Sequence, residues 1–222
     1  VLDIIHGYHT TFPSPIAQAC SFEPELVKEL ASATAKESSV NGLHVTLSPS
    51  LDLVRDPRWG RVTETPGEDT YLNSVMAKAI VEGYQGDDLS KEGTISACVK
   101  HFAAYGAVEG GREYGTVDVS ERNLRQYYLP PYKAAVDAGT GMVMCGFNAI
   151  AGIPASADKH ILREILRDEW GYKGAVISDY GSINNMNSHG ISDDNAVLSK
   201  FAIEAGIDIE MCINRYVTGL PK

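Results

Sequence analysis

The sequence predicts an α/β fold in which helices pack against a parallel sheet. Short runs of small and β-branched apolar residues alternate along the chain with longer segments of helical spacing. This strand–helix unit repeats about six times, and parallel strands require such crossover connections. A chain of 222 residues is also long enough for one sizeable core. The alternation alone leaves two architectures open, a closed β/α barrel and an open doubly wound sheet.

The candidate strands are short and rich in Val, Ile and Leu, and several begin at a glycine. They lie at residues 1–5, 42–47, 94–99, 141–146, 174–177 and 206–211. The second ends at Ser48-Pro49, because proline cannot donate to a strand ladder. The fifth leads directly into Ser178-Asp179-Tyr180, so it predicts a carboxylate at a strand tip.

The candidate helices show apolar residues at intervals of three and four. They lie at residues 22–39, 71–84, 120–138, 159–169 and 194–205. Pro24 near the start of the first helix and Ser120 as the N-cap of the third are typical helix-start signals. The polar loop at residues 51–69 is long, and Trp59 between its arginines indicates that the loop is ordered.

Charge and motif content exclude several classes of function. The formal net charge of -10 argues against nucleic acid and anionic membrane surfaces as partners, since phosphate would be repelled. The apolar runs are of strand length, so none is expected to cross a membrane. Neither Gly-x-Gly-x-x-Gly nor a phosphate loop follows a strand, and there is no Gly-x-Ser-x-Gly motif. We expect no cofactor.

The four cysteines, Cys20, Cys98, Cys145 and Cys212, lack the spacing of metal ligands. We expect all four to be reduced residues of the core, with no disulfide and no metal role. The chain begins at Val1 without an initiator Met or a signal-peptide pattern. We therefore expect it to be a segment of a longer protein.

Charged residues gather where the candidate strands end. Asp3, Lys100, His101 and Asp179 lie at or just past strand ends, and Arg61 lies in the long loop after another strand. In a β/α barrel the carboxyl ends of the strands converge on one mouth, where active sites are built. Each residue also has a structural interpretation when taken alone; Asp179, for example, can cap the following helix. The recurrence on successive units favours a site.

The chemistry of this set suits a polar, uncharged ligand rich in hydroxyl groups. Cations beside carboxylates can hold such a ligand through charge-assisted hydrogen bonds. A metal site is not expected, because His101 adjoins a lysine and no His-x-x-x-His pair exists.

Several motifs follow one another in a fixed order along the chain. They are Asp3-Ile4-Ile5-His6-Gly7, Arg55-Asp56-Pro57-Arg58-Trp59-Gly60-Arg61, Glu68-Asp69 with Tyr71, Lys100-His101-Phe102, Ser178-Asp179-Tyr180 and Ala205-Gly206-Ile207-Asp208. Together they resemble glycoside hydrolase family 3, and most closely its bacterial β-glucosidase and β-xylosidase branch. The resemblance implies a (β/α)8 TIM-barrel-like catalytic domain, here incomplete, with about six β/α units in residues 1–222. A second α/β domain carrying the acid/base residue would lie outside this sequence.

The resemblance also implies an activity, the hydrolysis of terminal non-reducing β-D-glycosidic bonds in a β-linked oligosaccharide or glucoside. Asp179 would be the nucleophile of a retaining mechanism, which pairs two carboxyl groups about 5 Å apart. The remaining site residues would contact the terminal sugar. They are Asp3, Arg61, Lys100 and His101 at its hydroxyl groups, with Met144 and Tyr180 lining the subsite more weakly.

Two positions depart from the family pattern. Phe147 stands where many members have a tyrosine, so a possible hydroxyl partner of Asp179 is missing. The loop at residues 102–119 contains no histidine, which argues against the N-acetylglucosaminidase branch. The acid is therefore expected to be a glutamate outside the chain. The substitutes within it are Glu64, Glu68, Glu109 and Glu113, which are more typical of solvated loop charges.

Two alternatives remain for the function. The chain can be an inert sugar-binding or structural part of its parent, or a barrel enzyme that uses Lys100 as a Schiff-base amine. About six units cannot close an eight-stranded barrel, so the isolated segment would expose edge strands. We therefore expect it to need the missing C-terminal domain, to self-associate or to rearrange to a smaller closed sheet.

Overall fold

The computed structural model describes residues 1–220 and is built on a four-stranded parallel sheet. Its strands, in spatial order, are β1 (Val45–Thr46), β2 (Ser96–Phe102), β4 (Met142–Cys145) and β7 (Ala175–Ile177). All three pairings are parallel. The predicted α/β fold with a parallel sheet is thus confirmed, and the chain runs through the strands in their spatial order.

Single parallel bridges extend this sheet at both edges. Leu2 pairs with Thr46 beyond β1, and Ile209 pairs with Ile177 beyond β7. The six predicted strand positions therefore lie side by side, but the first and last are bridges and not full strands. Within residues 1–220 no pairing joins the Leu2 edge to the Ile209 edge, so these residues form an incomplete barrel wall.

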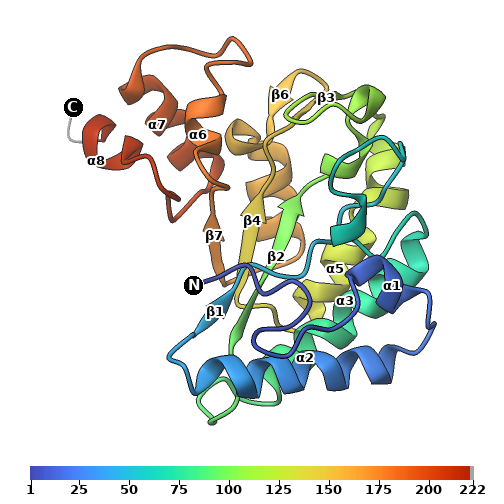
Figure 1. Ribbon diagram of the computed structural model, residues 1–222. Helices are drawn as coiled ribbons and strands as arrows, with labels where there is room; N and C mark the ends of the chain where they lie inside the picture. Colours follow the sequence, from blue (N-terminus) through green and yellow to red (C-terminus); the bar gives the residue numbers. More distant parts are fainter. Residues whose placement is uncertain (221–222) are drawn as a thin grey trace.

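Helices follow the strands in the predicted order, and Figure 1 shows the first three long ones stacked together beside the sheet. The elements at the predicted positions are α2 (Pro24–Ser39), α3 (Thr70–Gln85), α5 (Pro130–Asp137), the π-helical η6 (His160–Glu169) and α7 (Asn195–Ala205). The side chains of Asp69 and Asp194 cap α3 and α7 by accepting backbone N–H bonds. These caps set the observed starts.

The predicted helix at residues 120–138 is divided. Ser120 caps the short α4 (Glu121–Asn123) as expected. A π-helical turn, η4 (Leu124–Tyr128), follows, and α5 begins at Pro130. Proline lacks an N–H group and its ring crowds the preceding turn, which explains the break at this point.

A small second sheet lies above the ends of β2 and β4 (Figure 1). It consists of β3 (Thr116–Val117), β5 (Ala149–Ile150) and β6 (Ile153–Pro154). Ala151 and Gly152 join β5 to β6 with φ angles of 48° and 85°, the positive values that a tight hairpin needs. These strands were not predicted, because a strand of two residues is too short to show a periodic pattern.

Five short helical pieces also escaped prediction; they are α1 (Pro15–Ala19), η1 (Val62–Glu64), η2 (Tyr105–Ala107), η3 (Glu109–Gly111) and η5 (Ala155–Ala157). Two more, α6 (Ser182–Asn185) and α8 (Arg215–Gly219), lie before and after Ile209 in the sequence.

The long loop at residues 51–69 is ordered, as predicted. Trp59 is 2% exposed and packs edge-on against Tyr105, with 5.4 Å between the ring centroids.

The core has two parts. The larger lies between the sheet and its helices, and the smaller contains Leu47, Cys98, Met144 and Ile177 on the opposite face of the four strands.

The cysteines agree with the prediction only in part. Cys98 and Cys145 are buried as predicted, whereas Cys20 and Cys212 are exposed, so the assignment of all four to the core was wrong. Both exposed thiols lie in connections, where no apolar layer covers them. Among residues 1–220 no helix is long and apolar enough to span a bilayer.

Candidate functional site

Asp179 stands immediately past β7, as the sequence predicted. The preceding residue, Ser178, is fixed to the last segment of the sheet by two hydrogen bonds. Its N–H donates to Ile209 O at 2.9 Å, and its Oγ accepts from Met211 N–H at 2.8 Å. Asp179 is 8% exposed, and its Oδ1 accepts the N–H of Tyr180 at 2.6 Å. Its Oδ2 has no hydrogen-bond partner within residues 1–220. The carboxylate also does not cap α6, which begins after Gly181 without a side-chain cap.

Lys100 and His101 lie within the last residues of β2, because the strand continues to Phe102 and does not end at residue 99 as predicted. The register between β2 and β4 shifts between Val99 and Phe102, so both residues sit in an irregularity of the ladder. Such irregularities are common beside active sites, because they redirect side chains. The Lys100 Nζ lies 2.5 Å from Asp3 Oδ1. The ammonium is thus buried against a partly exposed carboxylate on the neighbouring edge.

The His101 imidazole lies between two carboxylates. Its Nε2 is 3.3 Å from Asp179 Oδ2, and its Nδ1 is 2.7 Å from Asp52 Oδ2. Asp52 has no exposed surface and also accepts hydrogen bonds from Ser50 Oγ and the Tyr132 hydroxyl. Burial alone would raise the pKa of Asp52, but its interactions with His101 and the charge of Arg61 outweigh that effect. The pKa of Asp52 is therefore lowered.

Asp52 was missed at the sequence level. It lies in the long loop, and loop carboxylates are usually solvated. One signal was available, because Asp52 stands between Leu51 and Leu53, both of which are buried. A carboxylate inside an apolar run needs a buried partner.

Arg61 approaches the same site from the long loop, held by a carboxylate of its own. Its Nε and Nη2 donate to the two oxygens of Glu64 at 2.9 and 2.7 Å. Burial would lower the pKa of Arg61, but Glu64, followed by Asp52 and Asp179, raises it above its usual range. The guanidinium stays charged, and its carbon lies 5.9 Å from the Tyr105 ring centroid.

An aromatic row extends from His101 to the surface. The Tyr105 ring meets the His101 ring at 5.3 Å and the Phe147 ring at 5.9 Å, and Phe147 meets Tyr114 at 4.9 Å. The Tyr105 hydroxyl donates to Glu113. Burial first, and Glu113 second, raise the pKa of Tyr105. The Phe147 side chain thus packs between two tyrosine rings and brings no hydroxyl of its own.

The remaining predicted residues lie below and beside this group. Met144 is 1% exposed and belongs to the small apolar cluster under the site, whereas Tyr180 is 63% exposed at its rim. Glu68 and Glu109 are exposed, and Glu64 and Glu113 are already engaged by Arg61 and Tyr105. Within residues 1–220 no group of three or more His, Cys, Asp and Glu side chains is arranged to hold a metal ion.

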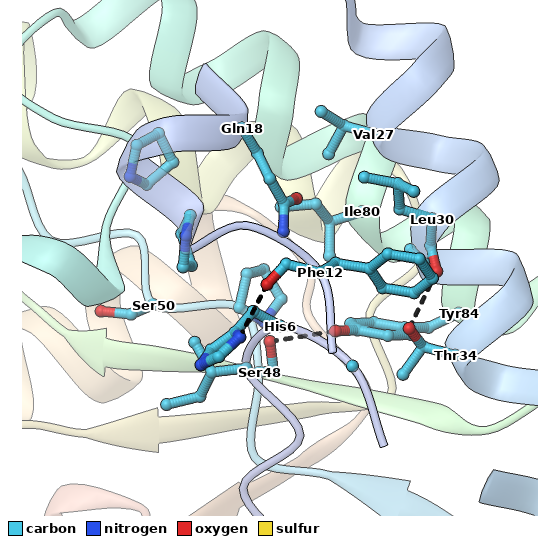
Figure 2. A pocket seen from close by; sticks show the side chains of 16 residues that line it. His6, Phe12, Gln18, Val27, Leu30, Thr34, Ser48, Ser50, Ile80 and Tyr84 are labelled. Carbon is cyan, nitrogen blue, oxygen red and sulfur yellow. Dashed lines mark hydrogen bonds between the residues drawn. The ribbon is translucent and has the colours of Figure 1, made fainter. Parts of the chain in front are cut away.

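A separate small cavity lies between the N-terminal segment and α1, α2 and α3 (Figure 2). Its volume of about 20 Å³ has room for one water. At its wall the Tyr84 hydroxyl donates to Ile4 O at 2.9 Å and contacts Ser48 Oγ at 3.3 Å. Burial raises the pKa of Tyr84 to about 12, against a smaller lowering by Ser48. The hydrogen bond to Ile4 fixes the backbone next to Asp3. We therefore regard this cavity as a structural feature beside the candidate site and not as a second candidate site.

Comparisons with known proteins concern the sequence of the chain and its fold. The chain is 44% identical over 223 residues to the periplasmic beta-glucosidase of Salmonella typhimurium, an alignment that covers 99% of this chain and 29% of that protein. A beta-xylosidase of Formosa agariphila is 39% identical over 98% of this chain and 31% of its own length. The crystal structure of beta-glucosidase from Listeria innocua in complex with glucose superposes with a TM-score of 0.96 at 48% identity, covering 99% of this chain and 31% of that one.

The family model described as the glycosyl hydrolase family 3 N terminal domain matches residues 1–222. The chain spans less than a third of the length of these relatives. The fold corresponds over 99% of this chain, and with the family match over its whole length the chain belongs to glycosyl hydrolase family 3.

Proposed function

We propose that the protein containing this chain hydrolyses terminal non-reducing β-D-glycosidic bonds with retention of configuration, and that β-glucosides are its first substrates. Asp179 is the nucleophile in this proposal. The name of the Salmonella relative and the glucose complex of the Listeria enzyme favour a glucoside. The Formosa relative makes a xyloside the second substrate to test.

The free Oδ2 of Asp179 is the observation that carries this proposal. A nucleophilic carboxylate needs one oxygen held and the other available. Oδ1 is fixed by the N–H of Tyr180, and Oδ2 forms no hydrogen bond within the described residues. Asp179 Oδ2 would attack the anomeric carbon and form a glycosyl-enzyme, which water then hydrolyses.

The charged groups around Asp179 support the binding of one terminal sugar. Lys100 and Asp3 form one pair of donor and acceptor, and Arg61 and His101 flank the nucleophile. Hydrogen bonds to charged groups are roughly twice as strong as neutral ones, so each can discriminate a hydroxyl position. In the proposal Tyr180 offers its exposed ring at the rim, and Met144 forms the floor.

The acid that protonates the leaving oxygen is proposed to come from a residue outside this chain. Glu64 and Glu113 are committed to Arg61 and Tyr105, and Glu68 and Glu109 face solvent. The relatives are more than three times longer than the aligned segment, and the proposed second α/β domain would supply the missing carboxyl group.

A Schiff-base mechanism at Lys100 has less support. Such a mechanism requires a neutral amine with a free electron pair. The Lys100 Nζ instead donates to Asp3 Oδ1 at 2.5 Å, so this hydrogen bond would have to break before the amine could attack a carbonyl.

The decisive experiment is to trap the full-length protein with an activated 2-fluoro-glucoside and to map the labelled peptide by mass spectrometry. We expect label on Asp179 and none after Asp179→Asn, whereas Asp118→Asn, an exposed control, should label normally. Label on another carboxylate would overturn the assignment, and borohydride-trapped substrate on Lys100 would favour the Schiff base. Binding of glucose with neither label nor turnover would favour an inert sugar-binding role.

A further inference from the structure

We propose that Asp52 is a positioning residue that fixes both the orientation and the tautomer of His101, so that Nε2 of the imidazole faces the sugar. The proposal rests on the glycosidase function above. It adds a residue that no motif in the sequence pointed to.

Both carboxylate oxygens of Asp52 are surrounded by hydrogen-bond donors. Its Oδ2 receives the His101 Nδ1 contact at 2.7 Å, the His101 backbone N–H at 3.1 Å and Ser50 Oγ at 3.0 Å. Its Oδ1 receives the Tyr132 hydroxyl at 3.2 Å. Asp52 has no exposed surface, so no water competes with these donors.

These contacts determine which nitrogen of His101 carries a proton. An ionised carboxylate can only accept hydrogen bonds. The Nδ1 of His101 must therefore be the donor in the 2.7 Å contact. The lowered pKa of Asp52 agrees with an ionised carboxylate. With Nδ1 committed to Asp52, Nε2 is the ring atom left for the site, 3.3 Å from Asp179 Oδ2.

The same contacts prevent the ring from turning over. A rotation by 180° about the Cβ–Cγ bond would put a C–H group toward Asp52 and lose the short bond. The Tyr132 hydroxyl shares its single proton between Asp52 Oδ1 at 3.2 Å and His101 O at 2.8 Å, so Asp52 and Tyr132 hold the backbone and the ring together. A displacement of about 1 Å in a positioned group can reduce turnover by about 100-fold. We therefore expect the loss of Asp52 to act through His101.

Asp52→Asn is the informative variant, because it keeps the shape but replaces the carboxylate with a neutral amide, a weaker acceptor that holds the His101 ring less firmly. The amide oxygen can still accept from His101 and Ser50, and its NH₂ group can donate to the Tyr132 hydroxyl, which retains His101 O as its own acceptor. Asp158→Asn is the matched control. Asp158 is another buried aspartate, 5% exposed, whose acceptors serve the backbone N–H groups of His160 and Ile161.

The test is a double-mutant cycle on kcat/KM for an aryl β-glucoside, with the full-length protein. We expect Asp52→Asn to lower kcat/KM by roughly 10- to 100-fold and Asp158→Asn to leave it within about twofold. In a His101→Gln background, Asp52→Asn should have little further effect, because the residue it positions is gone. Losses that multiply in the double variant, or a single Asp52→Asn variant as active as wild type, would overturn the proposal.

A measurement on the unaltered protein covers the case in which Asp52→Asn does not fold. The ¹⁵N chemical shifts of the His101 ring, assigned with His101→Gln, should show a protonated Nδ1. A bare Nδ1 would overturn the proposal. Failure of the parent function is a separate result: it would appear as a wild-type protein that cleaves no β-glycoside.

Discussion

Oδ2 of Asp179 lies 3.3 Å from Nε2 of His101, although β4 separates the strands that carry the two residues. Two local features of the chain accompany this contact. The irregular end of β2 directs His101 across the sheet, and β4 is followed by Gly146, which places no side chain at the strand tip. A Cβ there would lie 2.5 Å from Asn148 Oδ1 and 3.6 Å from His101 Cβ. The glycine therefore leaves room for the buried Asn148 side chain beside the site, whereas the distance to His101 Cβ is an ordinary contact.

Asp3→Asn tests the pair that Lys100 forms at the opposite side of the site. The change keeps the shape but removes the charge that lies 2.5 Å from the buried ammonium. Hydrogen bonds between charged groups contribute about 1.5–3 kcal/mol, so we expect KM for an aryl β-glucoside to rise about 10- to 100-fold. Steady-state kinetics of the full-length protein provide the check.

Asp88→Asn is the control for that variant, because Asp88 is exposed and serves only a turn, through Ser90 N–H. Its KM should equal that of wild type. An unchanged KM for Asp3→Asn as well would remove Asp3 from the proposed sugar site.

Glu64→Gln separates two roles for the glutamate beside Arg61. If Glu64 only orients the guanidinium, kcat/KM should fall by a similar factor, roughly 10-fold, for good and poor leaving groups. If Glu64 were the general acid, dinitrophenyl glucoside would be affected far less than an alkyl glucoside, because a good leaving group needs little protonation. The ratio of the two losses is the measurement, and we expect it to be close to 1.

The strand positions could be predicted from the sequence because each strand is a short apolar run that ends at a polar residue or glycine. The places of Lys100, His101 and Asp179 follow from that pattern together with the rule that the carboxyl ends of parallel strands share one edge, whereas the spatial order of the strands is known only from the structure. The bonds within the site do not follow from it. Asp52 and His101 are far apart in the sequence, and periodicity does not reveal which loop carboxylate turns inward.

The same limit applies to the small upper sheet and the division of the helix at residues 120–138. β5 and β6 turn at Ala151, a residue that rarely adopts positive φ and so gives no turn signal. Pro130 was visible in the sequence, but a proline in the first turn of a new helix and one that kinks a continuous helix look alike without the packing partners.

Gly83→Ala tests the close packing of α2 against α3. A Cβ at this position would lie 2.5 Å from Lys28 O and 2.6 Å from Ala31 Cβ, so the helices would have to separate. Overpacking of this kind costs about 1–3 kcal/mol, and the better helix propensity of alanine returns about 1 kcal/mol. We expect a net destabilisation of about 1 kcal/mol, measured by denaturant unfolding. Lys78→Ala on the exposed side of α3 should stay within about 0.5 kcal/mol of wild type; an equally stable Gly83→Ala variant would contradict the packing described.

Expression of residues 1–222 alone tests the expectation that the segment associates. Leu2 and Ile209 at the two sheet edges are 51% and 42% exposed, and edges of this kind favour pairing with other chains. Light scattering should therefore give a mass above that of one 24.0 kDa chain. A monodisperse monomer with a cooperative melt would contradict this prediction.

The contacts of His160 are expected to make a pH-dependent contribution to the free energy of unfolding. Its Nδ1 lies 2.6 Å from Glu164, and its Nε2 lies 3.1 Å from Glu121, which also pairs with Arg125. The hydrogen bond to Glu164, opposed by burial and assisted by Glu121, raises the pKa of His160 above its usual 6.5. A raised pKa in the folded state means that the stabilisation is complete below about pH 6.5 and is lost as the pH rises through the folded-state value.

The comparison with His160→Gln isolates this contribution. The side chain is 43% exposed, so solvent screening reduces it to a few tenths of a kcal/mol. The melting temperature of wild type should exceed that of His160→Gln at pH 6, and the difference should shrink toward pH 8 and in high salt. His44→Gln, at an exposed histidine, should show no such trend. A difference that grows with pH would mean that the neutral imidazole, and not the ion pair, stabilises this end of η6.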